Sequence, residues 1–221
     1  MPTILDEVEV RVLGALVEKQ VTTPEYYPLT LNALVLACNQ KSNRNPVVTY
    51  DEETVNNAIE SLRGKNLVYV FYGSTSRVPK YKHMMGEIFE LSPQELALMC
   101  VLMLRGPQTL GELRSRSDRL YDFSGLEEVE ETVRQLSTKE PQALALKLPR
   151  QPGQKEVRYA HLLSGEVSID YAPERESAEA DETGRHSRSD RIKDLEQEVE
   201  MLRTEFNRLR QEFEEFKKQF D

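Results

Sequence analysis

The sequence predicts a mainly α-helical protein with small β-hairpins, built from tandem winged helix-turn-helix domains and a C-terminal coiled-coil helix. Two successive units each show three helical apolar patterns followed by a pair of alternating strands. A segment poor in apolar residues comes next, and an unbroken heptad pattern ends the chain. The expected boundaries are 1–90 for the first domain, 91–163 for the second, 164–188 for an acidic flexible linker and 189–221 for the coiled coil.

Three helices are predicted in the first domain, because apolar residues recur every three or four positions. The first helix has its buried stripe at Leu5, Val8, Val12 and Leu16. The second begins after Thr30, and the third begins near Tyr50 or Asp51 and ends by Gly64. The polar turn between the second and third helices has the sequence KSNRN (41–45).

A β-hairpin, the wing, is predicted after the third helix because the apolar period changes from about 3.6 to 2. Residues 67–72 (LVYVFY) form the outgoing strand, 73–76 (GSTS) the turn and 77–83 (RVPKYKH) the returning strand. Pro79 has no N–H to donate to a ladder, so the returning strand is expected at the edge of its sheet.

The second domain repeats this order of elements. A helix over 92–105 starts where Ser92 can cap it and Pro93 fits the first turn. A second helix starts at Thr109, and a third spans 127–136. The hairpin is predicted from three alternating leucines, a turn and a returning strand: Leu144, Leu146, Leu148, 151–154 and 157–163.

The C-terminal segment carries a coiled-coil seam, in which apolar spacings of three and four alternate across four heptads. The predicted oligomerisation residues are Ile192, Leu195, Val199, Leu202, Phe206, Leu209, Phe213, Phe216 and Phe220. In a parallel pair each g position meets an e position of opposite charge, as Glu198 does with the partner's Arg203. A parallel homo-oligomer follows, with dimer and trimer both open. The alternative is an amphipathic helix folded back on its own domains.

Composition argues against several classes of protein. No signal peptide or membrane-spanning run is present, so we expect a cytoplasmic protein without membrane contact. Cys38 and Cys100 lie among apolar residues without CxxC spacing, as packing residues do. The histidines are scattered without metal-ligand spacing, and no nucleophile or nucleotide-binding motif appears. We therefore expect no enzyme, no metal and no cofactor.

The acidity of the chain is concentrated near its C-terminus. The net charge of the whole chain is −9. It is −2 over residues 1–90, 0 over 91–163 and −7 over the remainder. The overall charge therefore does not argue against nucleic-acid binding by the first domain.

The candidate DNA-binding residues come from the polar turn, the third helix and the wing of the first domain: Lys41, Asn43, Arg44, Asn56, Asn57, Arg63, Arg77, Lys80 and Lys82. Cations on the turn and wing can contact phosphates, and the three on the wing are expected on one face. Asparagine and arginine on the third helix can reach base edges. Asp51, Glu52 and Glu53 oppose this function, because their carboxylates would meet phosphates. A solvated outer helix face is the alternative.

The second domain is less suited to DNA. Its third helix carries Glu127, Glu128, Glu130 and Glu131, which a phosphate backbone would repel. Its basic residues gather instead on the second helix and around the wing: Arg114, Arg116, Arg119, Arg150, Lys155 and Arg158. This domain is more typical of a platform for a protein or for its own neighbour.

Four long segments resemble the YceH-like family of bacterial proteins. They are LVEKQVTTPEYYPLTLNALVLACNQKSNRNPVV (16–48), RVPKYKH (77–83), LMLRGPQTLGELRSRSDRLYDF (102–123) and LLSGEV (162–167). The similarity covers roughly residues 4–167 and implies a tandem winged-helix fold. The family has no assigned function, so the resemblance brings no catalytic residue with it.

Together these patterns predict a non-enzymatic DNA-binding protein that regulates transcription as a homo-oligomer. Its expected partners are double-stranded DNA and further copies of itself. The alternative is an interaction adaptor, in which the winged-helix domains bind another protein and the acidic linker keeps them apart.

Overall fold

A computed structural model describes residues 4–72, 78–150, 154 and 156–165. The chain divides into one unit over Met1–Val167 and another over Ser168–Asp221, and the described residues all belong to the first. The predicted coiled coil, with its seam from Ile192 to Phe220, lies outside the described residues. So do Arg77, the turn at 73–76 and nearly all of the predicted linker.

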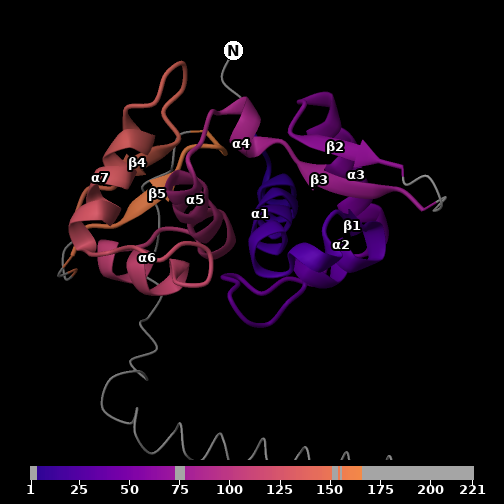
Figure 1. Cartoon of the computed structure of the whole chain (residues 1–221), viewed down its shortest axis with the longest axis horizontal. Coiled ribbons are helices and arrows are strands. Elements are labelled where there is room, and N and C mark those ends of the chain that lie inside the picture. The colour runs from indigo at the N-terminus through magenta and orange to yellow at the C-terminus, as the bar shows by residue number, and fades with distance from the viewer. Residues whose placement is uncertain (1–3, 73–77, 151–153, 155, 166–221) are drawn as a thin grey trace, which may run out of the picture. The chain divides into compact units, whose positions relative to one another are not determined.

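The first half of the described unit is mainly helical. Its elements are α1 (Glu7–Thr22), the 3₁₀ helix η1 (Pro24–Tyr26), β1 (Leu29–Thr30), α2 (Leu31–Cys38), α3 (Glu52–Gly64), β2 (Val68–Phe71), β3 (Lys80–His83) and α4 (Met85–Ile88) (Figure 1). Thr30 caps α2 and Asp51 caps α3, each through its side-chain oxygen. Both helices thus start where the sequence predicts.

The second half contains α5 (Pro93–Arg105), α6 (Leu110–Ser117), α7 (Leu126–Ser137), β4 (Ala145–Lys147) and β5 (Tyr159–His161). Ser92 caps α5 in a capping box with Glu95, and Thr109 caps α6 in another with Glu112. Small antiparallel hairpins close both halves. The predicted mainly α-helical class with small β-hairpins is therefore confirmed. None of the helices in the described part of the chain is long and apolar enough to cross a membrane.

The first sheet has the strand order β1-β3-β2, which corrects the prediction that the returning strand lies at an edge. β3 is central, because Tyr81 pairs with Leu29 on one side and with Val70 on the other. Pro79 lies one residue before the ladder, which begins at Lys80, so no ladder hydrogen bond is lost. The prediction missed the two-residue strand β1, which is too short to show a period.

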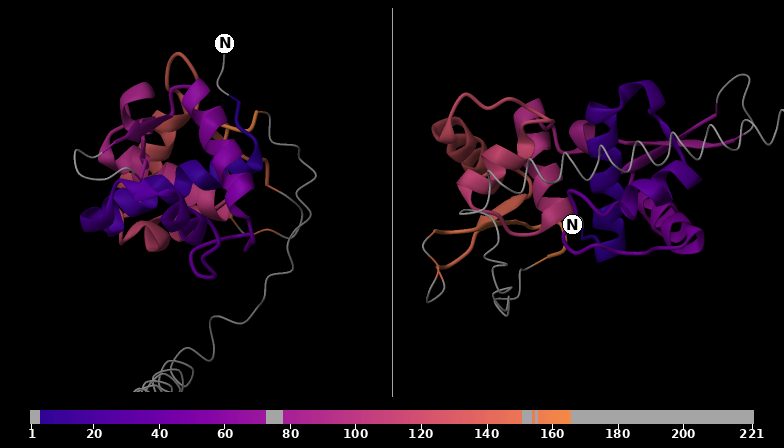
Figure 2. Two further views of the ribbon diagram at one scale, coloured as in Figure 1. Left: turned by 90° about the vertical axis from the view of Figure 1, so that its right-hand side faces the viewer. Right: turned by 90° about the horizontal axis from the view of Figure 1, so that it is seen from below.

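Helices α1 and α5 lie side by side at the centre of the described unit, with the remaining elements of each half on the outer sides (Figures 1 and 2). Gly14 permits this close approach: a Cβ atom there would lie 2.9 Å from Cδ2 of Leu104 and 3.2 Å from Cβ of Met103. Both helices bury long apolar runs, so the two halves share one continuous core.

A buried ion pair recurs at the same place in each half. Glu9 in the first turn of α1 binds Nζ of Lys65 at 2.6 and 2.7 Å, just after α3. Glu95 in the first turn of α5 binds Nζ of Lys139 at 2.9 Å through both oxygens, just after α7. Burial opposes ionisation of Glu9, but hydrogen bonds from Lys65 and neighbouring groups hold its pKa below the usual value. Each pair ties the third helix of a half to its first.

Candidate nucleic-acid interface

The loop between α2 and α3, residues 39–51, is held closed and packed against α5. The side chain of Asn39 donates to the carbonyl of Tyr50 and accepts from its N–H, both at 2.8 Å. The N–H of Asn45 donates to the carbonyl of Leu104 at 2.9 Å. The loop therefore belongs to the junction between the halves, not to an outward-facing turn.

Arg44 is the clearest correction to the predicted DNA-binding residues. Its side chain is fully buried, and its guanidinium forms a two-point ion pair with Glu18, at 3.0 and 2.7 Å. It also donates to the carbonyl of Ala37 at 2.8 Å, which lies in the last turn of α2. Because the Arg44 guanidinium is buried and paired with Glu18, it is not available to bind a phosphate.

The other loop residues divide between the junction and the surface. Asn43 has a φ of 59°, a left-handed conformation that asparagine tolerates, and its side-chain oxygen accepts from Arg105 of α5. Lys41 is exposed to solvent. Only one of the three predicted turn residues therefore keeps an accessible, unpaired side chain within the described part of the chain.

Helix α3 presents few free polar donors. Asn57 is exposed and Asn56 is half-buried. Arg63 is exposed, but Glu60 one turn earlier accepts from it at 2.7 and 2.8 Å. Hydrogen bonds from the side chain and the N–H of Thr54 lower the pKa of the Asp51 carboxyl, so this capping group stays ionised. If the start of α3 approached DNA bases, the carboxylates of Asp51, Glu52 and Glu53 would also approach the phosphates and repel them.

The β2–β3 hairpin presents cations and aromatic rings together. Phe71 pairs across the strands with Lys80, and Tyr69 pairs with Lys82, so all four side chains share one face. Tyr69 is 55 % exposed and Phe71 is 47 % exposed. The Nζ atom of Lys82 lies 6.0 Å from the centre of the Tyr69 ring. We call this set, Tyr69, Phe71, Lys80 and Lys82, the hairpin face.

The opposite side of the hairpin anchors it to the core. Tyr81 and His83 are buried, and the N–H of His83 donates to the hydroxyl of Tyr27 at 2.7 Å. The Nζ atom of Lys82 lies 4.0 Å from a carboxylate oxygen of Glu87, too far for a strong pair. Lys80 has no hydrogen-bond or ion-pair partner among the described side chains. The hairpin is therefore anchored to the core on one side, and Lys80 and Lys82 on its other side can bind an anion.

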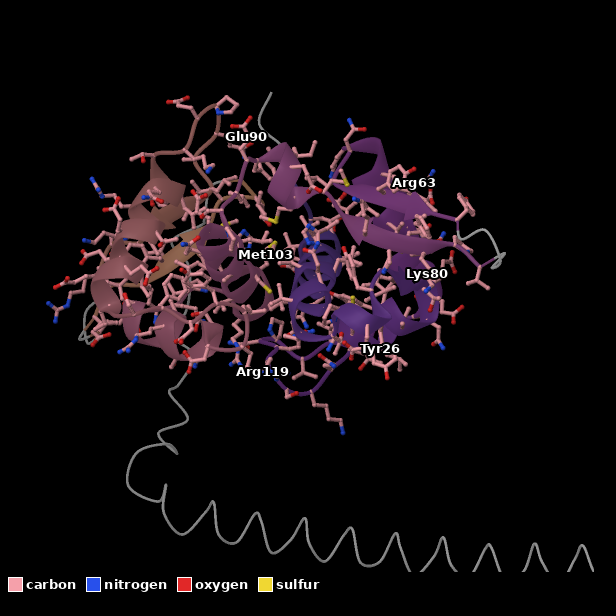
Figure 3. All side chains as sticks on the ribbon, in the orientation of Figure 1. Tyr26, Arg63, Lys80, Glu90, Met103 and Arg119 are labelled. Carbon is pink, nitrogen blue, oxygen red and sulfur yellow. The ribbon has the colours of Figure 1, made fainter. Side chains whose placement is uncertain are left out.

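The hairpin and the α2–α3 loop do not form one cationic surface. The hairpin extends away from α5, whereas the loop is bonded to it (Figures 1 and 2). Figure 3 shows both Lys80 and Arg63 at the outer side of the first half, where Arg63 is close to Tyr72 and Tyr81 but is already paired with Glu60. Of the predicted set, Lys80 and Lys82 remain the best-placed cations.

Tyr69 and Phe71 were not among the predicted site residues, although a simple signal marks them. Alternation places residues 69 and 71 on one side of their strand and 80 and 82 on one side of theirs. The predicted turn pairs Phe71 with Val78, and the observed ladder pairs it with Lys80, a shift of two that leaves the faces unchanged. Strand alternation alone therefore predicts that Tyr69 and Phe71 lie on the same face as the two lysines.

Comparison with known proteins places the chain in a family. A family model described as "Protein of unknown function, DUF480" matches residues 5–154. A UPF0502 protein of Opitutus terrae is 54 % identical over 200 residues, which cover 90 % of this chain and 84 % of that protein. One from Citrifermentans bemidjiense is 51 % identical, with 90 % of each chain covered. One from Geobacter sulfurreducens is 47 % identical, with 91 % of each covered.

The names of these relatives state no activity, ligand or partner. The predicted resemblance to YceH-like bacterial proteins is confirmed, and the chain belongs to the DUF480, or UPF0502, family.

Proposed function

We propose that the two halves are winged helix-turn-helix domains and that the protein is a non-enzymatic DNA-binding protein, a transcriptional regulator that acts as a homo-oligomer through its C-terminal seam. The observation that carries the DNA-binding proposal is the hairpin face, where two lysines and two exposed aromatic rings alternate across paired strands. Contact is made by the wing, with α3 kept out of the groove.

The chemistry of the hairpin face matches that of a nucleic acid. Lysines neutralise phosphates and release counterions, which provides most of the affinity in sequence-independent binding. Exposed rings stack on bases or pack on sugars, and stacking on an accessible base contributes about 1–3 kcal/mol. The carboxylates of Glu52 and Glu53 at the start of α3 are exposed and repel the backbone. The wing therefore attracts the DNA, and the carboxylates at the start of α3 keep that helix away from the phosphate backbone.

The test is the salt dependence of binding, measured by fluorescence anisotropy with labelled duplex and single-stranded DNA and the full chain. Lys80→Gln with Lys82→Gln removes two phosphate contacts, so the slope of log affinity against log salt should fall by about two. Tyr69→Ser with Phe71→Ser should weaken binding at every salt concentration without changing that slope.

The matched control is Lys147→Gln, which removes an exposed lysine from the hairpin of the second half. It should bind like the wild type. The proposal fails if the full chain binds neither form of DNA at low salt, or if Lys147→Gln changes the slope as much as the double lysine variant does.

A second candidate function, a protein-binding adaptor, is favoured by the acidic outer sides of the third helices. Glu127, Glu130 and Glu131 of α7 are exposed, and Glu131 pairs only with Arg134 and Gln135 of its own helix among the described residues. Such a surface suits a basic protein. If the protein is an adaptor, the chain binds no DNA. Reversing the charges on α7 then abolishes binding of the protein partner.

A further inference from the structure

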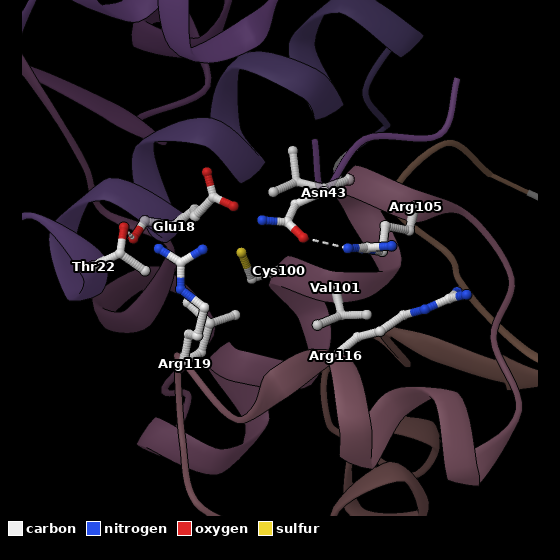
Figure 4. A pocket seen from close by; sticks show the side chains of 10 residues that line it. Glu18, Thr22, Asn43, Cys100, Val101, Arg105, Arg116 and Arg119 are labelled. Carbon is white, nitrogen blue, oxygen red and sulfur yellow. Dashed lines mark hydrogen bonds between the residues drawn. The ribbon is translucent and has the colours of Figure 1, made fainter. Parts of the chain in front are cut away.

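A pocket opens where α1 and the α2–α3 loop meet α5 and α6 (Figure 4). It is a half-open depression, and the space between its lining residues is about 360 Å³ when the open solvent at its mouth is included. Glu18 and Thr22 of α1 and Asn43 of the loop form one side, and residues from α5, α6 and the segment just after α6 form the other. Both halves of the described unit therefore contribute to a single site, which we call the junction pocket.

Positive charge dominates the junction pocket. Among the described residues that line it, Arg105, Arg116 and Arg119 are basic and Glu18 is acidic. The Glu18 carboxylate is bound by buried Arg44 at 3.0 and 2.7 Å, and Glu112 lies beside Arg116. Arginines therefore outnumber the carboxylates at the pocket, and its net charge is positive.

The three arginines differ in how far they are already engaged. Arg116 donates to Gln108, and its guanidinium lies 3.4 Å from Glu112. Arg105 donates to Asn43, and burial together with repulsion from Arg116 and Arg44 lowers its pKa. Burial is the largest cause of that shift, and the carboxylates of Glu18 and Glu112 act in the opposite direction.

Arg119 is the arginine with unused capacity. It is exposed, and none of the described residues forms a hydrogen bond or ion pair with it. In Figure 4 its guanidinium lies on the same side as Glu18 and Thr22, while that of Arg105 lies beside Asn43 and the thiol of Cys100 lies between them. A ligand in the pocket meets a cation on each side.

The rest of the wall is apolar and chemically inert. Val101, Leu104 and Leu120 line the pocket with hydrocarbon. Burial raises the pKa of the Cys100 thiol, so it remains protonated and is not a nucleophile. The surface thus combines a basic side with an apolar wall, as sites for small organic acids do.

We propose that the junction pocket binds a small organic anion, whose carboxylate or phosphate group is held between Arg119 and Arg105 and whose apolar part rests on Val101, Leu104 and Leu120. Arginine provides a planar donor fork that fits either oxyanion. Because the walls come from both halves, the bound anion fastens α1 to α5 and α6 and raises the stability of the described unit. The proposal does not depend on DNA binding.

The test uses the full chain with phenyl phosphate, benzoate, inorganic phosphate and benzyl alcohol, at constant ionic strength maintained with chloride. Calorimetry should show saturable binding of phenyl phosphate or benzoate, and the thermal midpoint should rise with the same ligand. Inorganic phosphate should bind more weakly, because it lacks the apolar part, and benzyl alcohol should not bind. The stronger of the two aromatic anions identifies the oxyanion that the pocket prefers.

Two arginine variants distinguish the pocket from nonspecific attraction. Arg119→Gln should weaken binding about tenfold or more, the loss expected for a charged hydrogen-bonding pair. Its unliganded thermal midpoint should be unchanged, since Arg119 has no partner to lose within the described residues. Arg114→Gln is the matched control, because Arg114 is exposed on α6 and does not line the pocket.

The outcomes decide the proposal. Saturable binding that falls in Arg119→Gln but not in Arg114→Gln supports it. Absence of saturable binding by both aromatic anions at millimolar concentration overturns it, and so does an equal loss in the two variants. A failure of the DNA-binding experiment leaves these readouts unaffected, so the two proposals fail independently.

Discussion

Arg44→Met should destabilise the protein by about 3–5 kcal/mol, the cost of removing one member of a buried, hydrogen-bonded ion pair. The substitution removes both guanidinium donors from the Glu18 carboxylate, which keeps only Lys19 at 3.7 Å among the described side chains, and both Arg44 donors from the carbonyl of Ala37. Methionine can fill the space of the aliphatic stem but cannot donate. Urea unfolding at neutral pH measures the loss as a shift of the midpoint.

Two further variants test whether the loss comes from leaving one buried charge without its partner. Arg63→Met removes an arginine that is also paired, but exposed, so its unfolding midpoint should match that of the wild type. Glu18→Leu combined with Arg44→Leu removes both charges and should recover most of the lost stability, because no unpaired charge remains. If Arg44→Met unfolds at the wild-type midpoint, the buried pair is not a structural element of the junction.

Acidification from about pH 7.5 to about pH 4.5 should destabilise the protein through two buried histidines, by about 2–3 kcal/mol each. Burial, with a smaller contribution from Lys82, lowers the pKa of His83 to about 4, against the opposing effect of Glu87. Burial alone lowers the pKa of His161 to about 4. In the unfolded chain both take up a proton near pH 6.5, so the unfolded state binds more protons throughout this window.

The hydrogen bonds of His83 agree with that direction. The N–H of Met85 donates to Nδ1 at 3.3 Å, and Nε2 donates to the side-chain oxygen of Gln20 at 2.6 Å, which together describe a neutral ring. The Nδ1 atom of His161 is buried without a partner in the described part of the chain. Protonation at either Nδ1 would therefore bury a charge with nothing to accept its proton.

The measurement is urea unfolding of the wild type and of His161→Leu at both pH values. Stability is fully present above the unfolded pKa and is lost as the pH falls toward the folded pKa, so the wild type should be weaker at the lower pH. His161→Leu should lose less on acidification and be at least as stable at neutral pH, since it removes an unpaired polar atom. Equal pH dependence in the two proteins would refute the assignment to His161.

Helix starts were predictable from sequence because each depends on a few adjacent residues. Thr30, Ser92 and Thr109 cap the helices that the sequence assigned to them. Long-range partners left no such local signal. The pairs of Glu9 with Lys65 and of Glu95 with Lys139 join residues far apart in the chain.

The candidate site was predicted less well, for a related reason. Arg44 sits in a polar turn, and nothing local distinguishes an arginine that binds phosphate from one that folds inward to Glu18. Strand alternation placed Lys80 and Lys82 on one face, as the ladder shows. It does not place Arg77 with them, because positions 77 and 80 are an odd number of residues apart, and Arg77 lies outside the described residues. The sequence did not predict that Lys80 and Tyr81 pair with β1, because that strand has only two residues.

Zero-length photocrosslinking of the full chain to bromodeoxyuridine-substituted DNA, followed by peptide mapping, tests most directly whether the hairpin face contacts nucleic acid. Stacked aromatic side chains are the groups placed to react with the excited base. The account predicts adducts on Tyr69 or Phe71 that disappear when Lys80 and Lys82 are both replaced by glutamine. Adducts confined to α3 or α7, or an unchanged pattern in that double variant, would contradict it.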